Sequence, residues 1–294
     1  MDKRILVIID HIKYCAPALK QAGILAKHFN QNIELICFTY EHSAHIPLEL
    51  SPSQLEQVKQ ARLGQTANEL AEQLLVINHE TQIEQSILWH KYPSQWLSDD
   101  CDFSKYSMVI KTRHIDNQQQ FSQLDWQLIR TSPLPVYLAA DQTWRNNKNV
   151  FGSLDLASKK ASKVALNQAV IESCISFAQM NQASAKFGYA VSISPLLRDL
   201  GFVYVDETQM NALDNIPSDQ QAILKQYQII NDVAVKAGPA EKVIPSLAAD
   251  VNAGLVVIGS VGRKGLKGKL LGNTAEKILN LLKTDLLILT PEKE

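Results

Sequence analysis

The sequence has neither a large charge imbalance nor a long apolar run. Its formal net charge is −1 at pH 7, so no overall field draws it towards nucleic acid or an anionic membrane. No stretch approaches the ~20 consecutive apolar residues of a membrane-spanning helix. The start, MDKRILVIID, passes directly into a strand-like run and lacks the pattern of a secretory signal. We therefore expect a cytoplasmic globular protein with no nucleic-acid or membrane partner.

Cysteine is also scarce and scattered. The four cysteines are Cys15, Cys37, Cys101 and Cys174, with no CxxC pair and no metal-type spacing between them. Isolated buried thiols are the simplest interpretation. The sequence therefore predicts no resident metal site.

What the sequence does contain is an internal repeat. Apolar strands alternate with helical segments in both halves, and the first strand of each half ends in an aspartate. These strands are Ile5–Ile9, which precedes Asp10, and Val150–Leu154, which precedes Asp155. Strands so uniformly apolar are typical of a parallel sheet that is covered on both faces. The repeat therefore indicates a duplicated α/β domain.

We predict an α/β fold of two tandem doubly wound domains, each a five-stranded parallel sheet with helices on both faces. The domains are placed at residues 1–141 and 149–294, because the intervening DQTWRNNKN is polar and has no periodicity. The segment Ser194–Ser218 is too apolar for a solvated loop. Core packing is its favoured interpretation, and the lining of a cleft near a ligand is the alternative.

A glycine-rich loop follows the apolar strand Leu255–Ile258 of the second half. Residues 259–274 read GSVGRKGLKGKLLGNT and lead into a helix. Glycines let backbone amides approach an anion, and a helix N-terminus favours phosphate. The loop exceeds the ~2–6 residues usual for this connection, and long loops in compact domains are often functional. Its spacing fits neither GxxxxGK[ST] nor GxGxxG.

The spacing Gly259-xx-Gly262-x9-Gly272 resembles the G-2x-G-9x-G-[S/T] signature of the nucleotide-binding universal stress proteins. The aspartates that end the first strands and the run LLGNTAEKIL also fit this family. The likeness extends over both halves and resembles the family's tandem bacterial type. It implies a stress-response protein with the universal-stress-protein-like, adenine nucleotide alpha hydrolase-like fold.

The resemblance also implies how the two domains associate. Family members dimerise through their last strands, which here are Val136–Ala139 and Leu286–Leu289. In a tandem chain the two domains would then form an intramolecular pseudo-dimer, which covers edges that otherwise invite aggregation. Further assembly into a homo-oligomer stays open.

Carried over position by position, the resemblance implies a site for ATP or a related nucleotide or phosphate ligand. The loop residues assigned to it are Gly259, Ser260, Gly262, Arg263, Gly272, Asn273 and Thr274. Asp155 would lie by the nucleoside and could hold Mg²⁺, and Val191 would line the base pocket. Asn273 replaces the Ser/Thr of the signature, so ATP as the ligand stays open.

The first half lacks this loop. The stretch Lys111–Trp126 contains no glycine. An offset of 148 residues, taken from the apolar strands, sets Lys111 opposite Gly259 and Leu124 opposite Gly272. Without glycine, close approach of the backbone to a ligand is lost. We therefore expect the first domain to be a degenerate copy that serves as the pseudo-dimer partner.

Three functions remain in view. Binding of a phosphate-bearing ligand by the second domain is favoured. A slow ATPase or phosphotransferase would need a metal-binding acid and a group that orients water, and Asp155 is the one acid the loop region offers. A ligand-free interaction scaffold is the third, to which Asn273 gives weight. No catalytic residue is assigned.

Overall fold

A computed structural model describes residues 3–41, 49–75, 81–113, 121–140, 149–260 and 273–291. The chain divides into two compact units. One comprises Met1–Leu128 with Leu134–Gln142, and the other comprises Ile129–Pro133 with Thr143–Glu294. The proposed linker, residues 141–149, lies outside the described residues except for Asn149, which is the first residue of β6, so the predicted domain boundaries stay a prediction.

The strands of the first unit form a parallel sheet in the order β3-β2-β1-β4-β5. Its elements run β1 (Arg4–Ile9), η1 (Ile12–Tyr14), α1 (Ala16–Phe29), β2 (Ile33–Thr39), α2 (Pro52–Leu74), β3 (Ile83–Trp89), α3 (Pro93–Asp99), η3 (Phe103–Lys105), β4 (Tyr106–Thr112), α4 (Gln123–Thr131) and β5 (Val136–Ala139).

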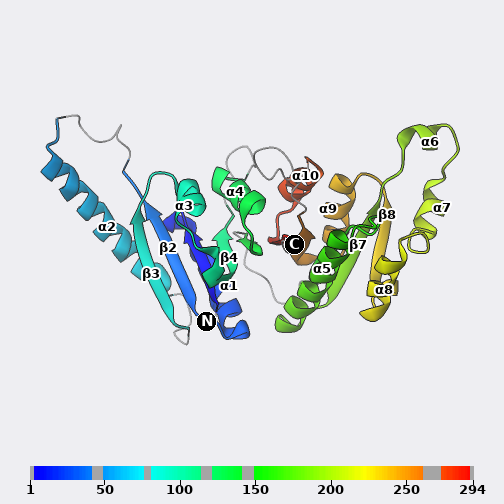
Figure 1. Ribbon diagram of the computed structural model, residues 1–294, viewed down its shortest axis with the longest axis horizontal. Helices are drawn as coiled ribbons and strands as arrows, with labels where there is room; N and C mark the ends of the chain where they lie inside the picture. The colour runs from blue at the N-terminus through cyan, green and yellow to red at the C-terminus, as the bar shows by residue number, and fades with distance from the viewer. Residues whose placement is uncertain are drawn as a thin grey trace. The chain divides into compact units, whose positions relative to one another are not determined.

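The second unit repeats this parallel order as β8-β7-β6-β9-β10. Its elements run β6 (Asn149–Leu154), α5 (Ala161–Met180), β7 (Ala185–Val191), α6 (Pro195–Asp199), α7 (Val205–Met210), α8 (Ser218–Gln226), η4 (Ile230–Asp232), β8 (Val233–Ala237), α9 (Ala240–Asp250), β9 (Ala253–Gly259), α10 (Asn273–Leu281) and β10 (Asp285–Leu289). Figure 1 labels helices and strands from both units.

Helices cover both faces of each sheet. The chain first steps outward from the central strand in one direction and then returns past it, and right-handed crossovers put the helices of the two directions on opposite faces. In the second unit, α5 contacts α8 on one face and α9 contacts α10 on the other (Figure 1). This arrangement confirms the predicted doubly wound α/β fold.

The central strands form the core of each unit. In β1 the residues Ile5–Ile9 are at most 2% exposed, and in β9 the residues Leu255–Val257 are fully buried. Such complete burial explains why these runs carry no polar alternation. Within the described residues, no helix is long and apolar enough to cross a membrane.

The first strand of each unit carries the same irregularity. The pairing of β1 with β4 shifts register between Arg4 and Ile5, and the pairing of β6 with β9 shifts between Asn149 and Val150. Each bulge inserts one unpaired residue at the start of the neighbouring strand. Both sheets are therefore built on the same register.

That register corrects the equivalence inferred from the sequence. Ile8 pairs with Lys111, and its counterpart Ser153 pairs with Ile258. The offset between β4 and β9 is therefore 147 residues rather than 148, and Thr112, not Lys111, occupies the place of Gly259. Because α4 begins at Gln123 and α10 at Asn273, Ser122, not Leu124, precedes its helix as Gly272 does. The error arose because matching apolar strands by composition does not fix their register to one residue.

Most of the apolar segment between β7 and α8 does not pack into the core, although Ala212 and Ile216 are buried. It forms the short helices α6 and α7, and most of its large side chains are exposed, with Phe202 at 74% and Met210 at 81%. The core-packing interpretation of Ser194–Ser218 is therefore wrong for these side chains. The segment instead borders a cleft described below.

Candidate functional site

Asp155 directly follows β6 and presents an exposed carboxylate. Its side chain is 53% exposed, and one oxygen lies 2.8 Å from Nζ of Lys163 on α5. Exposed pairs of this kind contribute little stability, so the carboxylate can exchange its partner at small cost. Asp155 is therefore available at the edge of the sheet where doubly wound folds bind ligands.

A buried amide network fixes the backbone around Asp155. The Asp155 N–H donates to Oδ1 of Asn167 at 3.0 Å, and Nδ2 of Asn167 donates back to the Asp155 carbonyl at 2.9 Å. Asn167 also donates to Gln220, which in turn donates to the carbonyl of Ser158. Asn167 and Gln220 are buried, so these bonds hold the β6–α5 loop in one conformation.

Gly259 ends β9 in a place where no side chain fits. A Cβ on Gly259 would lie 2.6 Å from two side-chain carbons of Leu166. The next residue, Ser260, is 4% exposed, and its N–H donates to the Leu289 carbonyl at 2.7 Å. The Ser260 amide is therefore used in strand pairing, which leaves its hydroxyl as the group that could reach a ligand.

The structure describes only some of the remaining predicted loop residues. Gly262, Arg263 and Gly272 lie outside the described residues. Asn273 is the first residue of α10, and Thr274, the second, is exposed. The start of this helix at Asn273 agrees with the predicted order of strand, loop and helix.

A cleft of about 430 Å³ lies beside the end of β7. It is lined by Ala157, Tyr189, Val191, Phe202, Val203, Tyr204, Glu207, Thr208, Asn211, Ala212, Asn215 and Ile216. Burial, with a smaller effect from the Asp155 carboxylate, raises the pKa of Tyr189. Val191 and Tyr189 therefore face one cleft, and Asp155 lies close enough to act on Tyr189. The sequence prediction included Val191 and missed Tyr189, although Tyr189 precedes it by two residues on the same face of β7.

At the corresponding edge of the first unit, a buried cation is paired with the aspartate that follows β1. Lys111 is fully buried in β4, and its Nζ lies 2.9 Å from Oδ2 of Asp10 and 2.9 Å from Oδ1 of Asp125. The same Nζ donates to the Thr112 carbonyl at 3.0 Å. Asp10, at 13% side-chain exposure, is therefore committed to an internal partner.

The N-terminus of α4 is capped by its own residues. The Ser122 N–H donates to Oδ2 of Asp125 at 3.0 Å, and the Asp125 N–H donates to the Ser122 hydroxyl at 3.1 Å. This reciprocal pair is a capping box with aspartate in the usual place of Glu or Gln. The Asp125 carboxylate therefore occupies the place at the helix N-terminus that an anionic ligand would take.

The described residues could bind Mg²⁺ only together with a phosphate-bearing ligand. None of them forms a group of three or more His, Cys, Asp or Glu that could hold a metal ion. Mg²⁺ is commonly bound by one or two carboxylates together with substrate phosphates. The single exposed carboxylate of Asp155 suits that shared arrangement and does not form a protein-only site.

Comparisons with known proteins also distinguish the two halves of the chain. Residues 157–290 match the Universal stress protein family. The chain is 28% identical over 303 residues to universal stress protein E of Salmonella typhi, covering 100% of this chain and 96% of that relative. Two solved structures share the fold. A functionally unknown protein of Pseudomonas aeruginosa PAO1 has a TM-score of 0.70 and 22% identity, and the match covers 99% of this chain and 93% of that chain. A universal stress protein of Archaeoglobus fulgidus has a TM-score of 0.56 and 13% identity, and the match covers 98% of each chain. The second half of this chain thus matches the universal stress protein family, and the whole chain is similar along its full length to universal stress protein E.

Proposed function

We propose that the second unit binds a nucleotide or another phosphate-bearing ligand, and that the first unit is its degenerate partner. Membership of the universal stress protein family supports a stress-response role. The observation that carries the ligand proposal is the contrast at the two helix N-termini. The third residue of α4 is Asp125, whose carboxylate caps the helix, whereas the third residue of α10 is Ala275.

The surroundings of Asp155 support the same proposal. An exposed carboxylate on a rigid loop can accept hydrogen bonds from a ribose, and the neighbouring cleft offers Tyr189 and Val191 to a base. The ligand phosphates would lie at the loop 259–274, where Gly262, Arg263 and Gly272 complete the predicted set. Asp155 would hold any Mg²⁺ that those phosphates bring.

The association of the two units remains part of the proposal. We infer that the apolar strands β5 and β10 pair within one chain, which makes it a pseudo-dimer in the cytoplasm. Sedimentation at increasing protein concentration checks whether chains also associate into larger homo-oligomers.

Two glycine substitutions test the ligand site. The native protein is purified, denatured and examined by mass spectrometry for a captured nucleotide, and binding of ATP and AMP is measured by calorimetry. Gly262→Asp and Gly272→Leu should each lower affinity at least about 10-fold, because they put a negative charge or bulk where phosphate would sit. The control is Gly64→Asp on α2, where a Cβ meets no atom within 4 Å.

Unchanged binding in both loop variants would show that the ligand lies elsewhere. Release of inorganic phosphate above a no-enzyme control, lost in the two loop variants and kept in Gly64→Asp, would favour a slow ATPase. Absence of any captured or added ligand would leave the interaction scaffold as the function.

A further inference from the structure

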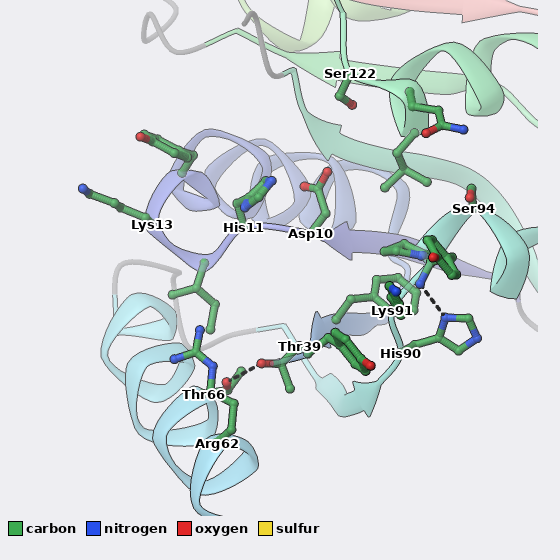
Figure 2. Close-up of a pocket in the computed structure, with 18 of the residues that line it drawn as sticks. Asp10, His11, Lys13, Thr39, Arg62, Thr66, His90, Lys91, Ser94 and Ser122 are labelled. Carbon is green, nitrogen blue, oxygen red and sulfur yellow. Dashed lines mark hydrogen bonds between the residues drawn. The ribbon is translucent and has the colours of Figure 1, made fainter. Parts of the chain in front are cut away.

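A second cleft lies wholly within the first unit. Its volume is about 570 Å³, within the range of small-molecule sites. It opens at the carboxyl ends of β1, β2 and β3 and reaches the start of α4. Figure 2 shows side chains of Asp10 and His11 on one side of the cleft and those of Arg62 and Thr66 on the other.

The cleft occupies the place where doubly wound sheets bind ligands. β1 lies between β2 and β4, so the direction of the chain reverses there. Crevices at such switch points are the general ligand sites of this architecture. The degenerate copy has therefore lost a loop but kept a cavity at the binding edge.

Arg62 gives this cleft an unsatisfied donor. The Nη1 atom of Arg62 donates to Gln65 at 3.1 Å, whereas its Nε is buried and has no hydrogen-bond partner among the described residues. A buried donor without a partner is costly, and native proteins rarely leave one without a reason. Arg62 lines the cleft, so a small movement of its guanidinium would bring this donor to an acceptor on a ligand and offset the cost.

A second cation is held at the opposite rim. The His90 side chain accepts a hydrogen bond from the Tyr92 N–H at 3.1 Å, which fixes the turn that carries Lys91 (Figure 2). The Lys91 ammonium lies 5.1 Å from the centre of the Tyr92 ring. Tyr92 is 54% exposed and Tyr14 is 50% exposed, so two aromatic faces border the opening.

The charge of the cleft suits an anion of low charge. The formal charges at and directly behind it leave a balance of +1, from four cations and three carboxylates: Lys13, Arg62, Lys91 and Lys111 against Asp10, Glu69 and Asp125. A triphosphate would bring about four negative charges to this balance. Lys111 already contacts two carboxylates, and the Asp125 carboxylate caps α4, so neither offers a phosphate site.

We propose that the first unit binds a compact ring-bearing anion, with a single phosphate or carboxylate, in this cleft. Arg62 and Lys91 contact the anionic group, and the aromatic side chains Tyr14 and Tyr92 cover the ring. The site is separate from the one proposed for the second unit and does not depend on it.

The test uses the full chain with Gly262→Asp, so that the second unit does not contribute. AMP and indole-3-carboxylate are the probes, one for each source of the anionic group, with adenosine and ATP for comparison. Binding is followed by calorimetry. We expect saturable binding of one or both probes, adenosine weaker than AMP, and ATP no tighter than AMP.

Arg62→Gln and Lys91→Gln should each weaken the bound probe about 10-fold, which is the loss expected for one charge-assisted hydrogen bond. Lys59→Gln on the same helix α2 is the matched control, because Lys59 lies outside the cleft and pairs with Glu56. Lys91 is exposed, so its variant keeps the test valid if Arg62→Gln perturbs folding.

Three results would overturn the proposal. One is no binding of either probe at about 1 mM, the weak limit of useful affinity. Another is tighter binding of ATP than of AMP. The last is equal affinity in Arg62→Gln, Lys91→Gln and Lys59→Gln. None of these results bears on the second unit, whose ligand binding is tested separately by Gly262→Asp and Gly272→Leu in the otherwise wild-type chain.

Discussion

The two units end their first strand with the same residue and use it in opposite ways. Asp10 is turned towards Lys111 inside the sheet, whereas Asp155 faces solvent with Lys163. The side chains of Lys111 and Lys163 are 0% and 22% exposed. A buried lysine, together with a carboxylate on the next helix, thus holds the first aspartate inside its unit, whereas the second aspartate stays exposed to solvent.

The largest effect should come from removing the buried cation. Lys111→Met leaves the Asp10 and Asp125 carboxylates facing each other without their shared partner, and breaking a buried pair costs about 3–5 kcal/mol. Urea unfolding followed by tryptophan fluorescence measures this loss, because Trp89, Trp96 and Trp126 all belong to the first unit.

Lys105→Met is the control for this change, since Lys105 is 62% exposed and lies 3.9 Å from Asp102. Its effect should stay within about 0.5 kcal/mol. A loss of equal size in both variants would mean that the Lys111 network is no more than a surface pair.

A smaller loss is expected from adding a side chain at the end of β9. Gly259→Ala forces its Cβ against Leu166, and overpacking of this kind costs about 1–3 kcal/mol. The same substitution at Gly64, where no atom lies within 4 Å, should stabilise α2 by up to about 1 kcal/mol. Thermal unfolding by circular dichroism measures both. Shifts of the same sign would contradict the packing explanation.

Loss of the capping box of α4 should lower the free energy of unfolding by a smaller amount. Ser122→Ala removes the hydroxyl that accepts from the Asp125 N–H, at a cost of about 1 kcal/mol. Ser122→Gly, which introduces the residue type that precedes α10, should cost only a few tenths of a kcal/mol. Urea unfolding compares the two variants. A loss of no more than a few tenths of a kcal/mol in Ser122→Ala would show that the hydrogen bond from the Asp125 N–H contributes little to the helix start.

The smallest effect belongs to the exposed pair. Lys163→Met removes the partner of Asp155 and should change stability by less than about 1 kcal/mol, because both side chains are partly solvated. Circular dichroism of the thermal transition measures the change. A loss as large as that of Lys111→Met would erase the distinction between the two aspartates.

The sequence was sufficient to predict the alternation of strands and helices and the aspartates that end β1 and β6, because buried parallel strands leave long apolar runs. It did not reveal the role of Lys111. Whether a lysine in a strand is solvated or buried depends on Asp125, which comes from another element through tertiary packing. The core-packing prediction for Ser194–Ser218 was wrong for a related reason, since an apolar composition does not distinguish a core from the wall of a cleft.

The register shift shared by β1 and β6 bears on the history of the chain. Regular strands and helices can arise repeatedly, but an extra residue at one place in a strand pair is an arbitrary detail. Its presence at the same step in both sheets indicates that one ancestral gene segment already had it before the duplication. Loss of the glycine loop in the first copy is then a later event, to be sought among relatives in which Thr112 and Ser122 are still glycine.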